Sequence, residues 1–171
     1  MDNNNVLQRL RYTFDLSDDQ MIEIFGLAEV EVTRAEISDW LKKEDDPEFK
    51  KLHDKPLATF LNGFISLKRG KKEGETPKPE KKLTNNLILR KLKIALNLQS
   101  EDILAILELS NFKLSKHELS AFFRKPSQNQ YRVCKDQVLR NFLMGLQLKH
   151  RPKAPQATKQ DENTKPDAQQ N

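Results

Sequence analysis

The sequence has few of the residues that a disulfide or a metal site requires. Its 171 residues include one cysteine, Cys134, and three histidines, His53, His117 and His150. A single cysteine excludes an intramolecular disulfide and any zinc site built from several cysteines. The histidines form no metal-binding motif, and no glycine motif for phosphate or dinucleotide binding occurs. We therefore expect no catalytic residue, no metal and no cofactor, and predict that the protein is not an enzyme.

Long apolar runs and strand patterns are also absent. No segment approaches the roughly 20 apolar residues that a membrane helix needs. Residues 1–10 lack the basic start and apolar block of a signal peptide, so we expect a cytoplasmic protein without a membrane partner. Glycine is scarce, at 5 residues, and no stretch alternates strictly between apolar and polar residues. Because helix-forming residues predominate, the composition predicts an all-α fold.

One helix start is present twice. Residues 33–43 (TRAEISDWLKK) and residues 115–125 (SKHELSAFFRK) lie 82 positions apart. In each copy a hydroxyl residue is followed three positions later by glutamate, the pairing that satisfies free backbone N–H groups where a helix begins. The two pairs are Thr33 with Glu36 and Ser115 with Glu118. Both segments are therefore predicted to be helix N-termini.

The repeat extends over most of the chain. A shift of 82 residues aligns residues 3–70 with residues 85–152 without a gap. Identical pairs include Asn4/Asn86, Leu10/Leu92, Ile24/Ile106, Glu36/Glu118, Asp54/Asp136, Leu57/Leu139, Phe60/Phe142 and Gly63/Gly145. This duplication predicts two like modules of about four helices each. Since each module is small for a core of its own, we expect them to pack together as a pseudo-two-fold pair.

Two segments outside the modules have no pattern of a core. Residues 71–84 join the modules, and their charged run KKEGETPKPEKK contains two prolines and one glycine, which predicts a linker. Residues 153–171 have no apolar periodicity and are predicted to form a disordered tail.

The last helix of each module carries two notable residue types. Asp54 and Asp136 stand where this helix is predicted to begin, so we interpret them as its N-caps. Gly63 and Gly145 stand in its middle, where glycine costs about 1 kcal/mol relative to alanine. Because both copies keep this glycine, we predict that another helix approaches closely there.

The two modules differ in charge. Residues 3–70 hold 10 lysines and arginines against 13 aspartates and glutamates, a net charge of −3. Residues 85–152 hold 12 against 5, a net charge of +7. A basic helical surface suits nucleic-acid phosphates. We predict that DNA or RNA binds through Arg90, Lys93, Lys113, Lys116, Arg124, Lys125, Arg132, Lys135 and Arg140.

Three other interpretations remain open at this point. The basic module could bind an acidic protein partner or mediate self-association, or its charges could simply form a solvated surface. Alternatively, a pocket between the modules, lined by Trp40 or Phe60, could bind a small ligand. In module 1 we expect any recognition surface to include Trp40, Lys42 and Lys43.

The second and third helices of each module are similar to a helix-turn-helix unit. Its exposed residues would be Arg34, Ser38 and Asp39 in module 1, and Lys116, His117 and Ala121 in module 2. Only the second set has chemistry suited to DNA, and any small helical bundle gives the same pattern.

Three runs resemble a known family. These are residues 40–49 (WLKKEDDPEF), 60–70 (FLNGFISLKRG) and 85–107 (NNLILRKLKIALNLQSEDILAIL). They are similar to the YehS-type bacterial proteins, two-repeat proteins with a domain of unknown function. The resemblance covers residues 3 to about 149. It implies a cytoplasmic bacterial protein with two helical domains, and it supplies no catalytic or binding residues.

Overall fold

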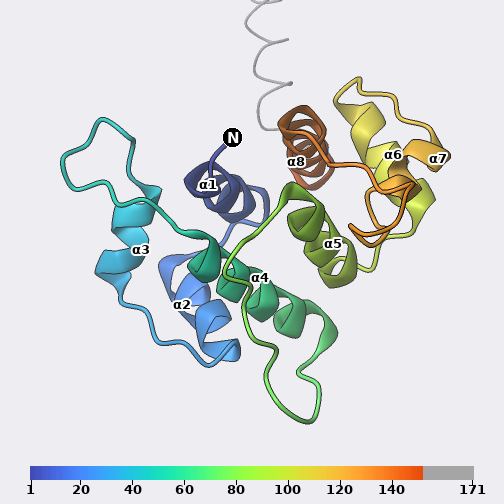
Figure 1. Ribbon diagram of the computed structural model, residues 1–171. Helices are drawn as coiled ribbons and strands as arrows, with labels where there is room; N and C mark the ends of the chain where they lie inside the picture. The colour runs from blue at the N-terminus through green and yellow to red at the C-terminus, as the bar shows by residue number, and fades with distance from the viewer. Residues whose placement is uncertain (152–171) are drawn as a thin grey trace, which may run out of the picture.

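The structure is a computed structural model that describes residues 1–151. Over these residues the chain forms eight α-helices and no strand (Figure 1). Module 1 contains α1 (Asn3–Thr13), α2 (Asp18–Leu27), α3 (Arg34–Leu41) and α4 (Asp54–Arg69). Module 2 contains α5 (Asn85–Ala95), α6 (Ser100–Leu109), α7 (Lys116–Ala121) and α8 (Asp136–His150). The all-α prediction is confirmed, and the tail predicted for residues 153–171 lies outside the described residues.

Helix starts follow the predicted capping pattern in both modules. The Thr33 hydroxyl accepts the Glu36 backbone N–H, and the Glu36 carboxylate accepts the Thr33 N–H. Ser115 and Glu118 make the same pair of hydrogen bonds. The helices α1 and α5 begin and end at equivalent residues, as do α2 and α6. Local sequence therefore sets these boundaries twice in the same way.

The modules pack through four central helices. In Figure 1, α1, α4, α5 and α8 occupy the middle of the molecule, with α2 and α3 on one side and α6 and α7 on the other. Between the modules, α4 packs on α5 and α1 packs on α8. Exchanging the two modules turns the α4–α5 contact into the α8–α1 contact, which is the pattern of a pseudo-two-fold pair. The predicted pairing is thus confirmed.

The core of each module closes around a glycine. A Cβ atom placed on Gly63 of α4 would overlap the backbone carbonyl of Ile24 in α2, and one placed on Gly145 of α8 would overlap the carbonyl of Ile106 in α6. Only a residue without a side chain allows the helix backbones to come this close. The predicted close approach is confirmed at both positions. Around it lie fully buried apolar side chains such as Phe60, Phe64 and Phe142.

A buried asparagine holds the segment between the last two helices of each module. The Asn4 amide nitrogen donates to the Trp40 carbonyl (3.0 Å) and the Lys50 carbonyl (2.9 Å), and the Asn4 oxygen accepts the Leu52 N–H (3.0 Å). Asn86 repeats these contacts with Phe122, Arg132 and Cys134. We call each set of three hydrogen bonds an asparagine clamp. Each asparagine satisfies three backbone groups that a helix-free segment leaves without partners.

The prediction that Asp54 and Asp136 are N-caps is wrong. The caps are His53 and Lys135, and each aspartate is the first residue inside its helix. One Asp54 oxygen accepts from the Asn3 amide at 2.7 Å and the other from the Leu83 N–H at 2.9 Å. These two hydrogen bonds lower the pKa of Asp54.

Asp136 makes the equivalent contacts in module 2, and its partner from outside the module comes from the start of module 1. It accepts from the Asn85 amide at 2.7 Å and from the Met1 ammonium group at 3.1 Å. Leu83 precedes α5 and Met1 precedes α1, so the segment before each module binds the carboxylate of the other module. The carboxylates are used to join the modules, and a capping rule that considers one helix alone does not predict this.

Candidate functional site

Three of the ten cations of module 1, Arg11, Arg34 and Lys42, are paired with acids. The Lys42 ammonium lies 2.6 Å from an Asp39 carboxylate oxygen and 3.5 Å from Glu48. Its hydrogen bond to Asp39 is the main reason why the pKa of Lys42 is raised. The Arg11 guanidinium lies 3.0 Å from Asp18. Module 1 therefore neutralises these charges within its own surface.

Module 2 keeps two of these cations and lacks their partners. Arg124 is equivalent to Lys42, and Lys93 is equivalent to Arg11. The three acids that pair with Lys42 and Arg11 in module 1 are replaced by residues without charge: Asp39 by Ala121, Glu48 by Gln130 and Asp18 by Ser100. Within residues 1–151, neither Arg124 nor Lys93 has an acidic group at salt-bridge distance. The positive charge of module 2 thus arises partly from missing acids.

Five of the predicted cations gather at the C-terminal end of α7. The Arg90 guanidinium donates to the Phe123 carbonyl, and the Lys93 ammonium lies over the Phe123 ring, 5.8 Å from its centroid. Arg124 and Lys125 follow Phe123 directly in the chain. The Arg132 backbone N–H donates to the Ala121 carbonyl at 3.2 Å, which returns the chain to the same place. We call Arg90, Lys93, Arg124, Lys125 and Arg132 the basic surface.

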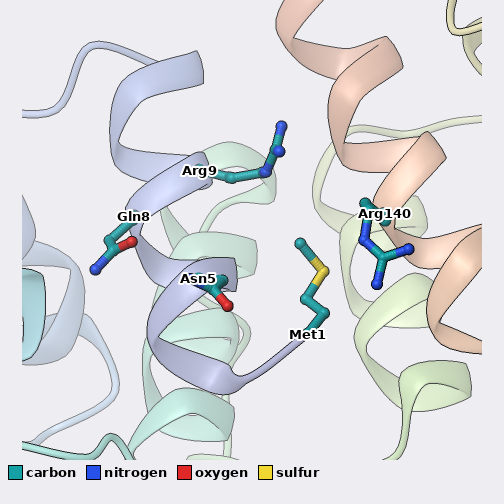
Figure 2. A pocket seen from close by; sticks show the side chains of 5 residues that line it. All are labelled: Met1, Asn5, Gln8, Arg9 and Arg140. Atoms are coloured by element: carbon teal, nitrogen blue, oxygen red, sulfur yellow. The ribbon is translucent and has the colours of Figure 1, made fainter. Parts of the chain in front are cut away.

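The other four predicted cations lie apart from the basic surface. Lys113 is exposed in the turn between α6 and α7, and Lys135 is exposed just before α8. The Lys116 ammonium forms an ion pair with Glu101 at 2.8 Å, which raises the pKa of Lys116. Arg140 projects from α8 toward α1, on the boundary between the modules (Figure 2). The structure therefore places only five of the nine predicted cations in the basic surface.

The helix-turn-helix interpretation is wrong at one of its named residues. The sequence pattern predicts that Ala121 is exposed, whereas only 7% of it is accessible. The helix α7 contains six residues and ends at Ala121. Lys116 and His117 are exposed, as are Arg34 and Ser38 in module 1, while Asp39 is half-buried.

The predicted recognition surface of module 1 includes a residue that packs against the core. Trp40 is half-buried and packs on Phe25, with ring centroids 5.6 Å apart. Lys42 is held in its ion pairs, and Lys43 is exposed. A surface pocket of about 410 Å³ does adjoin Lys42, Lys43 and Phe49, but Trp40 does not line it.

The proposed inter-module pocket exists in a different place. Phe60 is fully buried, so it cannot line a ligand pocket as predicted, and Trp40 packs within module 1. A pocket of about 530 Å³ lies between α4, the linker and α5. Its apolar lining residues include Leu27, Ile65, Leu87 and Ile94. The pairing of α4 with α5 creates this pocket, and sequence periodicity within one module does not predict it.

Cys134 has no features of a nucleophile. It is fully buried beneath the Asn86 clamp, and burial raises the pKa of its thiol to about 12. The thiolate form is therefore disfavoured at neutral pH. Among residues 1–151, no group of three or more histidine, cysteine, aspartate or glutamate side chains is arranged to hold a metal ion.

Comparison with known proteins fits the two-module geometry. A family model described as a protein of unknown function (DUF1456) matches residues 3–70 and, separately, residues 85–151. The chain belongs to this family. The DUF1456 match falls on the two modules and omits the linker, in agreement with the duplication seen in the sequence.

One curated relative shares the DUF1456 arrangement over almost its full length. The uncharacterized protein YehS of Escherichia coli (strain K12) is 42% identical over 144 residues, which cover 84% of this chain and 92% of the relative. No solved structure matches the chain. In the described part of this DUF1456 protein, no helix is both long and apolar enough to span a membrane.

Sequence reasoning missed two features of the site. It did not detect that Ala121, Gln130 and Ser100 replace paired acids, although a residue-by-residue alignment of the two modules contains this signal. It also missed Arg9, which lies opposite Arg140 on α1 (Figure 2). Arg9 belongs to the acidic module, so a search based on net charge passes over it.

Proposed function

We propose that this protein binds nucleic acid through the basic surface of module 2. The observation that supports the proposal is the loss of Asp39, Glu48 and Asp18 equivalents around cations that both modules keep. A cation without an acidic partner remains available for a phosphate. In module 1 the equivalents of Arg124 and Lys93 are paired with acids, so we expect that module to bind more weakly.

The surroundings of the basic surface are suited to a polyanion. Arg90, Lys125 and Arg132 are exposed, and Arg124 and Lys93 are partly exposed. All five lie around one segment, and the half-buried Phe123 ring lies among them. Contacts of this kind bind the backbone and carry little sequence information. We therefore expect binding that is weakly sequence-dependent and falls steeply as salt rises.

The sharpest test restores the missing acids. In Ser100→Asp with Gln130→Glu, module 2 regains carboxylates at two of the positions that pair in module 1. We expect the affinity for a fluorescent DNA or RNA oligonucleotide to fall at least tenfold, and the salt slope of log K to decrease by about 1 for each phosphate group that the variant no longer binds. Fluorescence anisotropy at several salt concentrations measures both quantities. Both substitutions are at surface positions, so folding should be retained.

The matched control makes the reverse change in module 1. Asp18→Ser with Glu48→Gln removes acids there and should raise the affinity slightly or leave it unchanged. Failure of the native protein to bind any oligonucleotide near 50 mM salt, about the low end of the usual range, would contradict the proposal. Retention of an acidic protein after nuclease treatment would favour the interpretation of an adaptor instead.

A further inference from the structure

The two contacts between the modules contain equivalent cations. Arg9 on α1 and Lys91 on α5 occupy matching positions, as do Met144 on α8 and Asn62 on α4. Arg9 faces Met144, and Lys91 faces Asn62. One module boundary can therefore be compared directly with the other.

At the α4–α5 boundary the cation has two oxygen neighbours. The Lys91 ammonium donates to the Asn62 side-chain oxygen at 2.7 Å and lies 3.0 Å from a Glu80 carboxylate oxygen. Its side chain is 11% exposed. Glu80 belongs to the linker, so the chain itself supplies a carboxylate to this position. The molecule thus shows what kind of group binds a cation at this boundary.

At the α1–α8 boundary the cation has no comparable partner. The Arg9 guanidinium contacts the Met144 sulfur at 4.0 Å, and a thioether accepts hydrogen bonds only weakly. Arg140 lies on the facing helix, and Figure 2 shows the two arginines on opposite sides of the pocket with Met1 between them. Within residues 1–151 neither guanidinium has an acidic group at salt-bridge distance.

Asp136 is the acid closest to this pair in the chain, one helical turn before Arg140. Its two carboxylate oxygens accept from the Asn85 amide and the Met1 ammonium group. The carboxylate is therefore already engaged in joining the modules. The charge of Arg140 contributes to the lowered pKa of Asp136, but the carboxylate lies beyond salt-bridge distance of both arginines.

The pocket around the arginines is open and polar. It has a volume of about 460 Å³, and its lining residues are Met1, Asn5, Gln8, Arg9 and Arg140. The carboxamides of Asn5 and Gln8 add hydrogen-bonding groups beside the two guanidinium groups. We propose that Arg9 and Arg140 form a phosphate-binding site between the modules. Two positive charges match a dianionic phosphate, whereas the single Lys91 is matched by one carboxylate.

This site is separate from the basic surface and does not depend on the proposed function. It needs one residue from each module, so a ligand there would also bridge them. The phosphate could belong to a small phosphate ester or to a nucleic-acid backbone. These two sources present the same group to the arginines, and they differ in what is attached to it.

Calorimetric titration of the full chain with inorganic phosphate, a 5′-mononucleotide and a short single-stranded oligonucleotide tests the proposal. We expect Arg9→Ala and Arg140→Ala each to weaken binding about tenfold, the effect of removing one charge-assisted hydrogen bond. Arg9→Lys, which keeps the charge and loses the fork geometry, should give an intermediate loss. Binding of phosphate or the mononucleotide identifies a small ester, and binding of the oligonucleotide alone identifies a backbone phosphate.

Lys113→Ala is the matched control, because it removes one exposed charge far from the pocket. Equal affinities for this control and for both arginine variants would overturn the proposal, as would the absence of binding by all three probes. Since Arg140 is exposed, its variant should fold even if Arg9→Ala does not. The variant Ser100→Asp with Gln130→Glu should leave phosphate binding unchanged, which separates this site from the basic surface.

Discussion

Module 1 and module 2 have the same helical arrangement and net charges of opposite sign. Their helices begin at equivalent residues, and each has one buried asparagine clamp and one helix-crossing glycine. Their net charges are −3 and +7. The comparison indicates that a few buried residues maintain the fold, while acids outside the core were free to change. Each prediction below tests whether equivalent positions behave equivalently.

The largest effect is expected at the asparagine clamp. Asn4→Ala and Asn86→Ala each remove three hydrogen bonds and leave backbone groups unsatisfied. At about 1 to 1.5 kcal/mol per bond, each change should lower the free energy of unfolding by roughly 3 to 4 kcal/mol. Urea unfolding followed by circular dichroism measures this loss. A loss near zero in one module would show that its clamp contributes nothing.

The next effect concerns the helix crossings. Gly63→Ala and Gly145→Ala place a Cβ against a backbone carbonyl, so the helices must separate. Each change should cost about 3 kcal/mol, at the upper end for overpacking. Gly26→Ala is the control, since nothing lies within 4 Å of its Cβ. It should stabilise the protein by up to about 1 kcal/mol through helix propensity. Thermal unfolding of the three variants decides whether crowding is the cause.

A smaller effect should depend on pH. The pKa of Asp54 is lowered chiefly by its hydrogen bond from Asn3, then by that from the Leu83 N–H. Because the folded-state pKa lies below the unfolded value, this stabilisation is present above about pH 4 and is lost as the pH falls further. Asp54→Asn should be less stable at neutral pH and should lose less stability in acid.

The measurement is the unfolding free energy between neutral pH and about pH 3, the range in which a carboxylate titrates. Asp136→Asn provides the comparison between modules, since the pKa of Asp136 is lowered in the same direction by the Asn85 hydrogen bond. An unchanged acid dependence in both variants would show that other carboxylates control acid unfolding.

The smallest effect is expected at the end of α2. Glu29 has φ of 62°, and its equivalent Asn111 has φ of 61°. Asparagine adopts this left-handed conformation more readily than glutamate does. Glu29→Asn should therefore raise the free energy of unfolding by about 0.5 kcal/mol, and Asn111→Glu should lower it by a similar amount. A rise in the thermal midpoint for both variants would contradict the explanation.

The sequence predicts well those features of the fold that depend on a single helix. The Thr33 and Ser115 capping boxes place two helix starts, and the repeat places the rest. It predicts contacts between modules poorly. Asp54 has the chemistry of an N-cap, yet its carboxylate binds Leu83, because that neighbour comes close only after the modules pair. Local rules contain no information about such a partner.

For the candidate site, too, the sequence predicts local features and misses contacts between modules. The net charge of module 2 predicts a role for both Arg124 and Arg140, because a count of charges contains no distances. In the structure Arg124 belongs to the basic surface, whereas Arg140 faces Arg9 from the other module. The aligned modules show that the acid partner of Lys42 has no equivalent beside Arg124. They do not show that Arg9 and Arg140 line one pocket, since this depends on how α1 packs on α8.

The reciprocal packing of α1 on α8 and α4 on α5 has a consequence for a chain half this length. The same face of each module, formed by α1 and α4 or by α5 and α8, contacts the equivalent face of the other module. Such a surface is self-complementary. We expect residues 1–70 alone to form a symmetric homodimer through the faces of α1 and α4. The two-module chain is, in this sense, a dimer whose two subunits are joined in one polypeptide.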